Sequence, residues 1–196
     1  MKKIIIFAAL ITSSIICAEN IRLPQAAKTG GMSCREALNQ RQTIRTFKTE
    51  KLTTQLLANM LWSANGVNRT NGKRTAPSAM DKREVMIYVA LADGAYLYKP
   101  EEHILEKICD ADLRSYCGRY EAPCYFILVP DRTRQPREIF AAVDTGYVSQ
   151  NIYLAAAVNG LGTCAMGSVA DPGKLAEKLK LDKNMPLLVH PVGIPQ

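Results

Sequence analysis

Helical spacing of apolar side chains predicts four helices in this chain, over residues 34–40, 53–64, 138–159 and 172–181. The first has Ser33 at its start and Glu36 three residues later, which is the pattern of a capping box. The segment 138–159 is apolar around most of its circumference and is followed by Gly160. Such a helix suits the centre of the molecule or a subunit interface.

Five shorter apolar segments predict strands, over residues 84–92, 95–98, 124–129, 164–169 and 187–192. Asp93-Gly94 joins the first two as a hairpin. The third, CYFILV, is apolar without alternation, which is typical of a strand covered on both faces. We expect residues 101–108 to form a short helix or an irregular connection. The order of elements predicts an α+β fold of three layers, α/β/α, around a central, mostly antiparallel sheet.

Residues 1–18 have the pattern of a secretory signal. Two lysines precede an apolar run from Ile4 to Ile16, and the small Ala18 stands where cleavage is expected. The run is too short to cross a membrane comfortably. Cys17 raises the alternative of a lipoprotein signal, which the large Ile16 directly before it opposes. We therefore expect an exported protein, periplasmic or secreted, that is cut after Ala18.

The mature chain is expected to comprise an extended arm over 19–32 and a single domain over 33–196. No later apolar run has the length of a membrane span. The formal net charge is +7, of which Lys2 and Lys3 supply two, and the other basic residues are scattered among few aromatic ones. This pattern argues against a nucleic-acid-binding face.

The cysteines do not form a metal-binding pattern. Five of them follow residue 18, namely Cys34, Cys109, Cys117, Cys124 and Cys164, without CxxC spacing and without a histidine close by in the sequence. In an oxidising compartment we expect one disulfide, with Cys109 and Cys117 as the best pair, and the odd number leaves at least one free thiol. Cys34 and Cys124 lie in apolar patterns and are expected in the core.

Three stretches carry candidate chemistry, and the first is RQTIRTF over residues 41–47. Alternation places Arg41, Thr43 and Arg45 on one side, with Ile44 opposite. Two guanidiniums and a hydroxyl on one face suit a phosphate group. The alternative is a solvated strand edge whose arginines pair with acidic side chains.

The second stretch is GKRTAPSAM over residues 72–80. Pro77 stiffens the turn, and small neighbours such as Ala79 allow a planar ligand to approach the backbone. Ser78 offers a hydroxyl, and Arg74 can reach a phosphate or a carbonyl. The alternative is an ordinary basic loop.

The third stretch is NGLGTCAMGS over residues 159–168. Gly160, Gly162 and Gly167 permit tight turns and expose backbone amides. The stretch lacks the Lys-Ser/Thr ending of a Walker loop, and a helix rather than a strand precedes it, which excludes the GxGxxG dinucleotide turn. The alternative is a helix cap followed by a bend.

In this order, the stretches resemble the nitroreductase-like family of FMN enzymes. The branch that includes the azoline-oxidising dehydrogenases of ribosomal peptide maturation looks closest. The resemblance spans about residues 30–196. It rests on segments 65–69 and 74–79, the hairpin 93–98, DTG and QNIYL within 144–154, GLGT over 160–163, and PVGIP over 191–195, where Ile194 replaces the usual Tyr.

The resemblance implies an intertwined homodimer with FMN bound at its interface. By position, Arg41, Thr43 and Arg45 would hold the phosphate, with Arg74 as a further cation. The residues expected along the isoalloxazine ring are Pro77, Ser78, Ala79 and Met80. The residues expected to offer backbone amides near its reactive nitrogen, from across the dimer, are Ala165, Met166, Gly167 and Ser168.

The implied function is an FMN-dependent oxidoreductase with ping-pong transfer between a reduced donor and an acceptor. NAD(P)H is one candidate donor, and the acceptor would be a nitroaromatic, a quinone or a similar compound. The flavin would carry this chemistry, so no catalytic side chain is expected. Cys164, His190, Tyr147 and Tyr153 are therefore interpreted as packing residues.

Two alternatives stay open: an exported flavin-binding protein without turnover, and a cofactor-free interaction domain on the same fold. The chain also differs from the family pattern in two places. It ends at Gln196 without the Lys or Arg that many relatives add to the phosphate site, and the segments 110–123 and 132–137, which shape the substrate side, look short.

Overall fold

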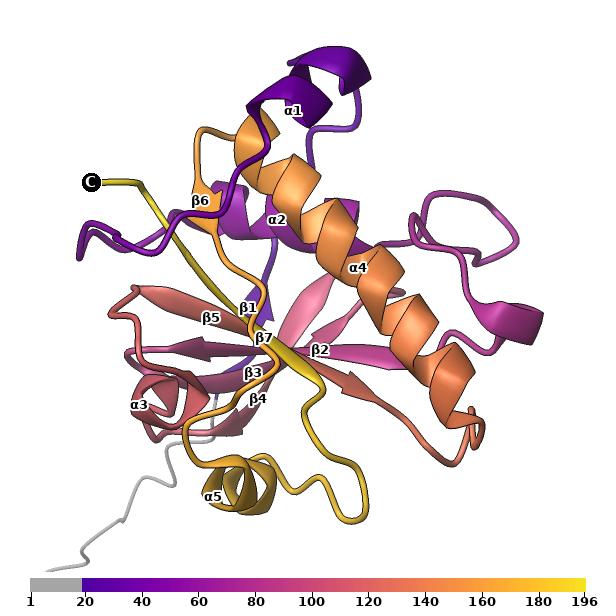
Figure 1. Ribbon diagram of the computed structural model, residues 1–196. Helices are drawn as coiled ribbons and strands as arrows, with labels where there is room; N and C mark the ends of the chain where they lie inside the picture. The colour runs from indigo at the N-terminus through magenta and orange to yellow at the C-terminus, as the bar shows by residue number, and fades with distance from the viewer. Residues whose placement is uncertain (1–18) are drawn as a thin grey trace, which may run out of the picture.

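The computed structural model describes residues 19–196, which form one antiparallel sheet between two layers of helices (Figure 1). The expected secretory signal, residues 1–18, lies outside the described residues. Within 19–196, no helix combines the length and the apolar character needed to cross a membrane. The same residues contain no cluster of three or more His, Cys, Asp or Glu side chains that could hold a metal ion.

Seven strands follow one another across the sheet in the order β1-β4-β3-β2-β5-β7-β6. Their bounds are β1 Ile21–Arg22, β2 Val85–Leu91, β3 Gly94–Lys99, β4 Ile104–Cys109, β5 Cys124–Pro130, β6 Gly162–Thr163 and β7 Leu188–Gly193. All neighbouring strands pair antiparallel. The predicted class, α+β with a central antiparallel sheet, is confirmed, as is the hairpin of β2 and β3.

The helices lie in two groups, one on each face of the sheet (Figure 1). Their bounds are α1 Cys34–Gln40, α2 Thr54–Asn65, α3 Arg114–Cys117, α4 Glu138–Val158 and α5 Pro172–Lys178, with a 3₁₀ turn, η1, over Ala79–Asp81. Helices α2 and α4 cover one face, with α1 packed against α4, and α3 and α5 cover the other. Strand β5 sends Phe126 and Leu128 into the first layer and Tyr125 and Ile127 into the second, which explains its unbroken apolar sequence.

The capping box predicted before α1 is present. The Glu36 amide donates to Ser33 Oγ over 3.3 Å, and the Ser33 amide donates to the Glu36 carboxylate over 2.8 Å. Because both groups at the helix start are satisfied locally, this helix could be located from sequence alone. The long helix α4 also begins at Glu138 as expected. It ends at Val158, and the chain changes direction at Gly160, whose φ is 66°.

Two expectations about strands were wrong. Residues 104–109 form β4, because pairing with β3 and β1 outweighs a local pattern that fits no period well. The range 164–169 forms no strand beyond a single bridge between Met166 and Val189, and the two-residue β6 precedes it at Gly162–Thr163.

The expected disulfide was also wrong, since the five described cysteines are all free. Cys117 is buried and its thiol donates to the Leu113 carbonyl, and burial raises the pKa of this thiol to about 12. Cys34 is exposed rather than in the core, because it occupies the outer side of the first turn of α1. Cys124 is buried, as expected.

Candidate functional site

The arginine stretch, residues 41–47, lies along β6 and the end of the chain. The Ile44 amide donates to the Thr163 carbonyl over 2.9 Å, and the Lys48 amide donates to the Ile194 carbonyl over 2.8 Å. A Cβ at Gly162 would lie 2.8 Å from Cγ2 of Ile44. Ile44 therefore points inward, opposite the neighbouring polar side chains, as its position in the sequence predicted.

Arg41 and Arg45 have no acidic partner among the described residues. Among residues 19–196, neither guanidinium lies within 4.0 Å of a carboxylate. Arg45 is exposed and Arg41 is half-buried. The solvated edge paired with acids, which was the alternative for this stretch, is therefore not what the structure contains.

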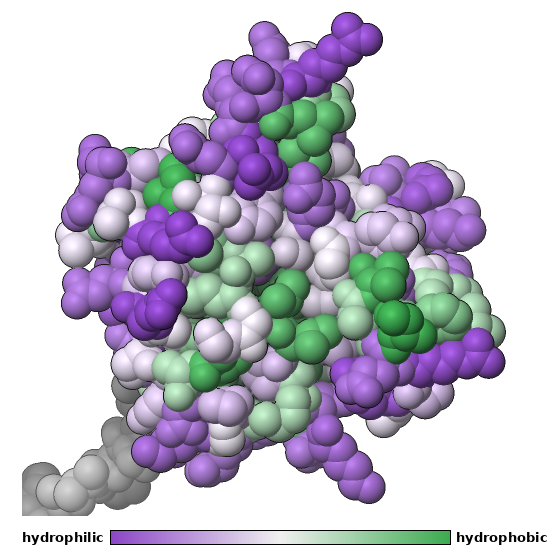
Figure 2. Space-filling model, viewed as in Figure 1, coloured by the Kyte–Doolittle hydropathy of each residue, from purple (hydrophilic) through white to green (hydrophobic). Residues whose placement is uncertain are grey.

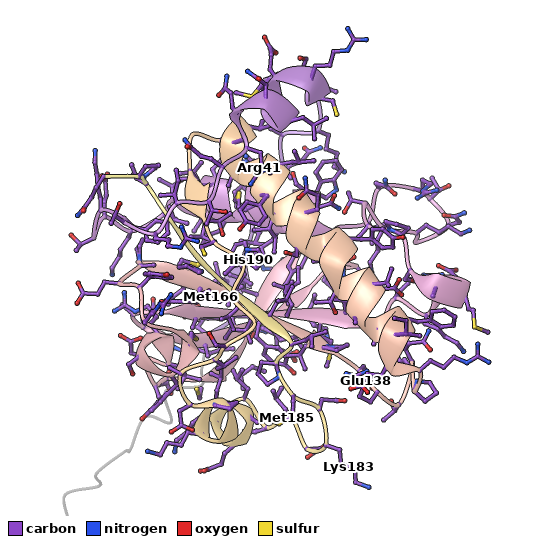
Figure 3. The ribbon with its side chains drawn as sticks, in the orientation of Figure 1. Arg41, Glu138, Met166, Lys183, Met185 and His190 are labelled. Atoms are coloured by element: carbon purple, nitrogen blue, oxygen red, sulfur yellow. The ribbon has the colours of Figure 1, made fainter. Side chains whose placement is uncertain are left out.

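Tyr153 of α4 connects the arginine stretch with the glycine-rich segment. Its hydroxyl accepts a hydrogen bond from the Ala165 amide over 2.9 Å and lies 3.1 Å from Thr43 Oγ1. The guanidinium of Arg41 stacks over its ring at 5.3 Å from the centroid. Figure 3 shows Arg41 near the carboxyl end of α4, with Met166 beside β7, the strand that contains His190. Tyr153, which was interpreted as a packing residue, thus connects the arginine stretch to the glycine-rich segment.

The glycine-rich segment has only part of its backbone free. The Ala165 amide is bonded to Tyr153, and the Met166 amide donates to the Val189 carbonyl over 2.9 Å. Within the described part of the chain, the amides of Gly167 and Ser168 have no hydrogen-bond partner, and Gly167 has open space around it. These two amides are the ones available to a ligand.

A cavity of about 660 Å³ lies at the end of the arginine stretch, where Phe47 lines it. Its other lining residues come from 48–51 and 112–123, with Ala92 and Tyr125, and Arg41, Arg45 and Tyr153 are not among them. A Cβ at Gly118 in its wall would touch the Met166 methyl group, so the glycine-rich segment packs behind this wall. Its size falls in the range of cofactor and small-molecule sites.

The cavity is rich in cations that sequence reasoning did not assign. Its lining includes Lys48, Lys51, Arg114 and Arg119. Arg114 is paired with Asp112 at 2.7 Å, whereas the other three form no ion pair with the described residues. Arg119 follows the glycine that faces Met166, and Lys48 follows the arginine stretch directly. That adjacency in the chain was the signal that could have found them.

The proline-containing turn, residues 77–81, is fastened by two side chains. Ser78 Oγ accepts a hydrogen bond from the Arg83 amide over 2.9 Å, which leaves its own proton free to donate elsewhere. Asp144 of α4 accepts a hydrogen bond from the Ala79 amide over 2.7 Å. Met80 follows with a φ of 57° and a side chain that is 70% exposed.

Arg74 is not brought to the arginine stretch. Its guanidinium is bonded to Glu101 at 3.1 Å, and its side chain is only 9% exposed. Arg69 donates to its carbonyl over 3.2 Å. Within one chain, Arg74 thus supports the loop that leads into the turn.

The turn and the arginine stretch are anchored on opposite sides of α4. Asp144 holds the turn and Tyr153 holds the arginine stretch. Nine residues of α-helix separate two side chains by roughly 14 Å along the axis and about 180° around it. Within one chain, the two segments are therefore anchored on different sides of the helix.

An exposed apolar stripe runs along α4 between those two sides. It consists of Ile139, Val143, Tyr147 and Val158, whose exposed fractions are 67%, 43%, 46% and 40%. Figure 2 shows apolar side chains over both ends of this helix, with polar ones around them. An apolar helix face of this kind marks an interaction surface.

His190 is a satisfied core histidine, as interpreted from the sequence. It is fully buried, with Ser149 Oγ at 2.9 Å from Nε2 and Thr163 Oγ1 at 3.1 Å from Nδ1. Burial lowers its pKa to about 3, so the ring is neutral at physiological pH. Cys164, also interpreted as packed, is 4% exposed.

The fold and these segments define a family. The profile of the nitroreductase family matches residues 38–194, and the chain belongs to that family. A nitroreductase homologue of Methanocaldococcus jannaschii is 31% identical over 178 residues, which cover 81% of this chain and 89% of that one. A crystal structure of a nitroreductase homologue from Ralstonia eutropha is 35% identical, with a TM-score of 0.85 and 90% of each chain covered.

A more distant solved structure shares the fold. It is a nitroreductase homologue of Desulfovibrio desulfuricans in complex with FMN, 20% identical, with a TM-score of 0.59 and with 82% of this chain and 85% of that chain covered. The placement of this chain in the branch with the azoline-oxidising dehydrogenases stays a prediction.

Proposed function

We propose that this protein is an FMN-dependent oxidoreductase that passes electrons from a reduced donor to a nitroaromatic, quinone or similar acceptor. The observation that carries the proposal is the contact at Tyr153, which connects the arginine stretch, with its two unpaired arginines, to the glycine-rich segment. Membership of the family and the FMN held by a relative of the same fold support the choice of cofactor.

The phosphate of FMN would be held by the arginine stretch. Arg41 and Arg45 offer guanidiniums without acidic partners, and Thr43 adds a hydroxyl fixed by Tyr153. Charge-assisted hydrogen bonds of this kind are the strong ones in proteins. Arg74 would act indirectly, since Glu101 already engages its guanidinium.

The flavin ring would lie between the glycine-rich segment of one chain and the turn of its partner. The free amides of Gly167 and Ser168 suit an electron-rich ring atom, and Met166 lies beside the cavity wall. The turn would contribute Pro77, Ser78, Ala79 and Met80, with the Ser78 proton as a donor. Ala165 would support the site through its bond to Tyr153.

The bound flavin would supply the hydride and electron transfer. The chain's own residues would bind and orient the ring, and no acid–base side chain is assigned a role. Lys48, Lys51 and Arg119, which lack ion pairs within 19–196, would attract anionic donors or acceptors to the cavity. NAD(P)H, which carries phosphates, is the donor that we propose to test first.

The site requires a homodimer in this proposal. The turn and the arginine stretch lie on opposite sides of α4, and the apolar stripe of Ile139, Val143 and Tyr147 lies between them. Packing α4 of one chain against α4 of another covers this stripe and brings one chain's turn toward the other chain's arginines.

Export is a separate part of the proposal. It rests on the basic and apolar pattern of residues 1–18 alone. NAD(P)H is expected to be scarce outside the cytoplasm, so an exported enzyme would take electrons from a different donor or from its own substrate. The mass of the protein recovered from its native compartment tests cleavage after Ala18.

The deciding experiment is an absorption spectrum of the purified mature protein, followed by identification of any flavin released on heating. We expect oxidised-flavin bands, release of FMN, loss of the bands with NADH and their return with a nitroaromatic acceptor. Bound FMN without turnover with any donor would favour the non-catalytic flavin protein. A colourless protein that does not take up added FMN would contradict the proposed function.

A further inference from the structure

Two carboxyl groups are buried together beneath the proline-containing turn. Glu84 stands directly before β2 and is fully buried, and Asp144 of α4 is 2% exposed. Sixty residues separate them in the chain, and no role was assigned to either from the sequence. Buried carboxyls are rare because each loses its hydration, so such a pair requires a reason.

The carboxyl oxygens of Asp144 and Glu84 differ in whether they accept a hydrogen bond. Asp144 Oδ2 accepts a hydrogen bond from the Ala79 amide over 2.7 Å. Neither carboxyl oxygen of Glu84 has a donor among residues 19–196. The Asp144 carboxyl is the neighbouring acid that raises the pKa of Glu84. One proton shared between the two carboxyls satisfies both, and without it two negative charges face each other in a buried space.

The charged groups around the pair do not remove this conflict. Arg132, in the segment after β5, is the cation that attracts Glu84, but its guanidinium also pairs with Glu138 at 3.6 Å. Arg83, adjacent in sequence, directs its guanidinium to Asp81 over 2.7 and 2.9 Å. Burial raises the pKa of Glu84 to about 7, and the neighbouring Asp144 carboxyl acts in the same direction.

The turn above the pair depends on its anchors. Met80, Asp81 and Arg83 have φ values of 57°, 55° and 50°, in the left-handed region that non-glycine residues adopt at a cost. Backbone of this kind persists only where surrounding contacts fix it. The bond from Ala79 to Asp144 is the contact that joins the turn to α4.

We propose that Glu84 and Asp144 share one proton and thereby act as positioning residues that hold the turn in its flavin-binding shape. This inference rests on the proposed function. When the shared proton leaves, repulsion between the carboxylates displaces Asp144 from the Ala79 amide and the strained turn loses its anchor. FMN binding should therefore weaken as the pH rises above about 7.

The test compares the wild type with Glu84→Gln, whose amide donates to Asp144 at every pH. We expect the dissociation constant of FMN, measured by flavin fluorescence, to rise about tenfold for the wild type between pH 6.5 and 8.5. We expect no such rise for Glu84→Gln. Because the FMN phosphate itself titrates near pH 6, the difference between the two proteins is the readout. Glu102→Gln, an exposed carboxyl on the β3–β4 turn, should behave as the wild type.

A second measurement uses the protein without flavin and separates this inference from the proposed function. Glu84 binds its proton more tightly in the folded protein than in the unfolded chain, where a glutamate titrates near 4.5. Its contribution to the free energy of unfolding is therefore fully present below about pH 4.5 and is lost as the pH rises through about 7. Urea unfolding should show this loss in the wild type and not in Glu84→Gln.

The outcomes are distinct. If FMN binds with the same pH dependence in the wild type and Glu84→Gln, the inference is overturned while the proposed function stands. If FMN does not bind at any pH, the proposed function fails, and the urea series still decides whether the proton is shared. If Glu84→Gln does not fold, a carbon-13 NMR titration of the Glu84 carboxyl decides instead, and a pKa near 4.5 contradicts the inference.

Asp144→Ala, which removes the acceptor of the Ala79 amide, should weaken FMN binding at every pH.

Discussion

The arginine stretch and the proline-containing turn, which we assign to the two ends of one flavin, are built in opposite ways. The arginine stretch lies on a fixed support: Ile44 packs on Gly162, and Tyr153 holds Thr43. Its cations have no partners within residues 19–196 and need no rearrangement to bind an anion. The turn has strained backbone and is held by a buried acid.

The arginine stretch would therefore bind through its charge, whereas the proline-containing turn would bind through the shape of its backbone. The charged half is complete in a single chain. The shaped half depends on the protonation of Glu84 and Asp144 and on a second chain that brings it to the flavin. Variants that separate the two chains should therefore have larger effects than variants that disturb either half.

The largest effect is expected from Val143→Glu. Val143 lies in the middle of the apolar stripe on α4 and is 43% exposed in one chain. Burying a carboxylate in an apolar interface costs several kcal/mol, so the variant should be monomeric in light scattering and should not retain FMN. Met185→Glu, at an apolar residue of similar exposure outside α4, is the matched control. A Val143→Glu dimer would rule out this interface.

The next effect is expected from Arg41→Ala combined with Arg45→Ala. Hydrogen bonds to charged groups contribute roughly 1.5–3 kcal/mol each, so the loss of two should weaken FMN binding by about 100-fold or more. Fluorescence titration measures the affinity, and light scattering checks that the dimer remains. Arg35→Ala combined with Lys183→Ala removes the same charge from exposed positions without ion pairs in the described structure and should change little. Unchanged affinity in the first double variant would contradict the phosphate assignment.

A smaller effect is expected from Gly162→Ala, which disturbs the support rather than the charges. The added methyl group would lie 2.8 Å from Cγ2 and 2.9 Å from Cβ of Ile44. Overpacking of this kind costs about 1–3 kcal/mol, and displacement of the arginine stretch should weaken FMN binding about tenfold. Gly173→Ala, where the new atom meets only ordinary contacts, is the control. Equal urea midpoints and FMN affinities for the two variants would show that the support is not rigid.

The smallest effect is expected from Tyr153→Phe. The ring under Arg41 stays, and only the bonds of its hydroxyl to Thr43 and to the Ala165 amide are lost. Each bond contributes about 1 kcal/mol to the folded chain, so the urea midpoint should fall slightly. Only part of this loss reaches the flavin site, and FMN binding should weaken about fivefold. An FMN affinity equal to that of the wild type would mean that Tyr153 is a packing residue only.

Much of the fold could be predicted because its signals are local. Ser33 and Glu36 satisfy each other across three residues, and the turn Ala92-Asp93, one residue before the predicted Asp93-Gly94, closes a hairpin between adjacent strands. The unbroken apolar run of β5 follows from helices on both faces. Strand β4 was missed because its conformation is set by pairing with β1 and β3, which lie elsewhere in the sequence.

The segments of the candidate site could be predicted from the sequence, but the contacts between them could not. The arginine stretch and the turn could be found from residue types, whereas the contact of Tyr153 with Thr43 spans 110 residues. The pairing of Arg74 with Glu101 and the burial of Glu84 beside Asp144 likewise depend on the tertiary fold. A charged residue inside an otherwise apolar element, such as Asp144 in α4, was the signal that the sequence offered.

The central claim is that each flavin lies between the arginine stretch of one chain and the turn of another. It is tested by mixing two variant chains, one with Arg41→Ala and Arg45→Ala and the other with Asp144→Ala, after each has been shown to bind FMN poorly alone. A mixed dimer then has one site with both halves altered and one site with both halves intact. We predict that mixing restores FMN binding at one site per mixed dimer with wild-type affinity. If the mixture binds no more FMN than the separate variants, both halves belong to one chain and the account is wrong.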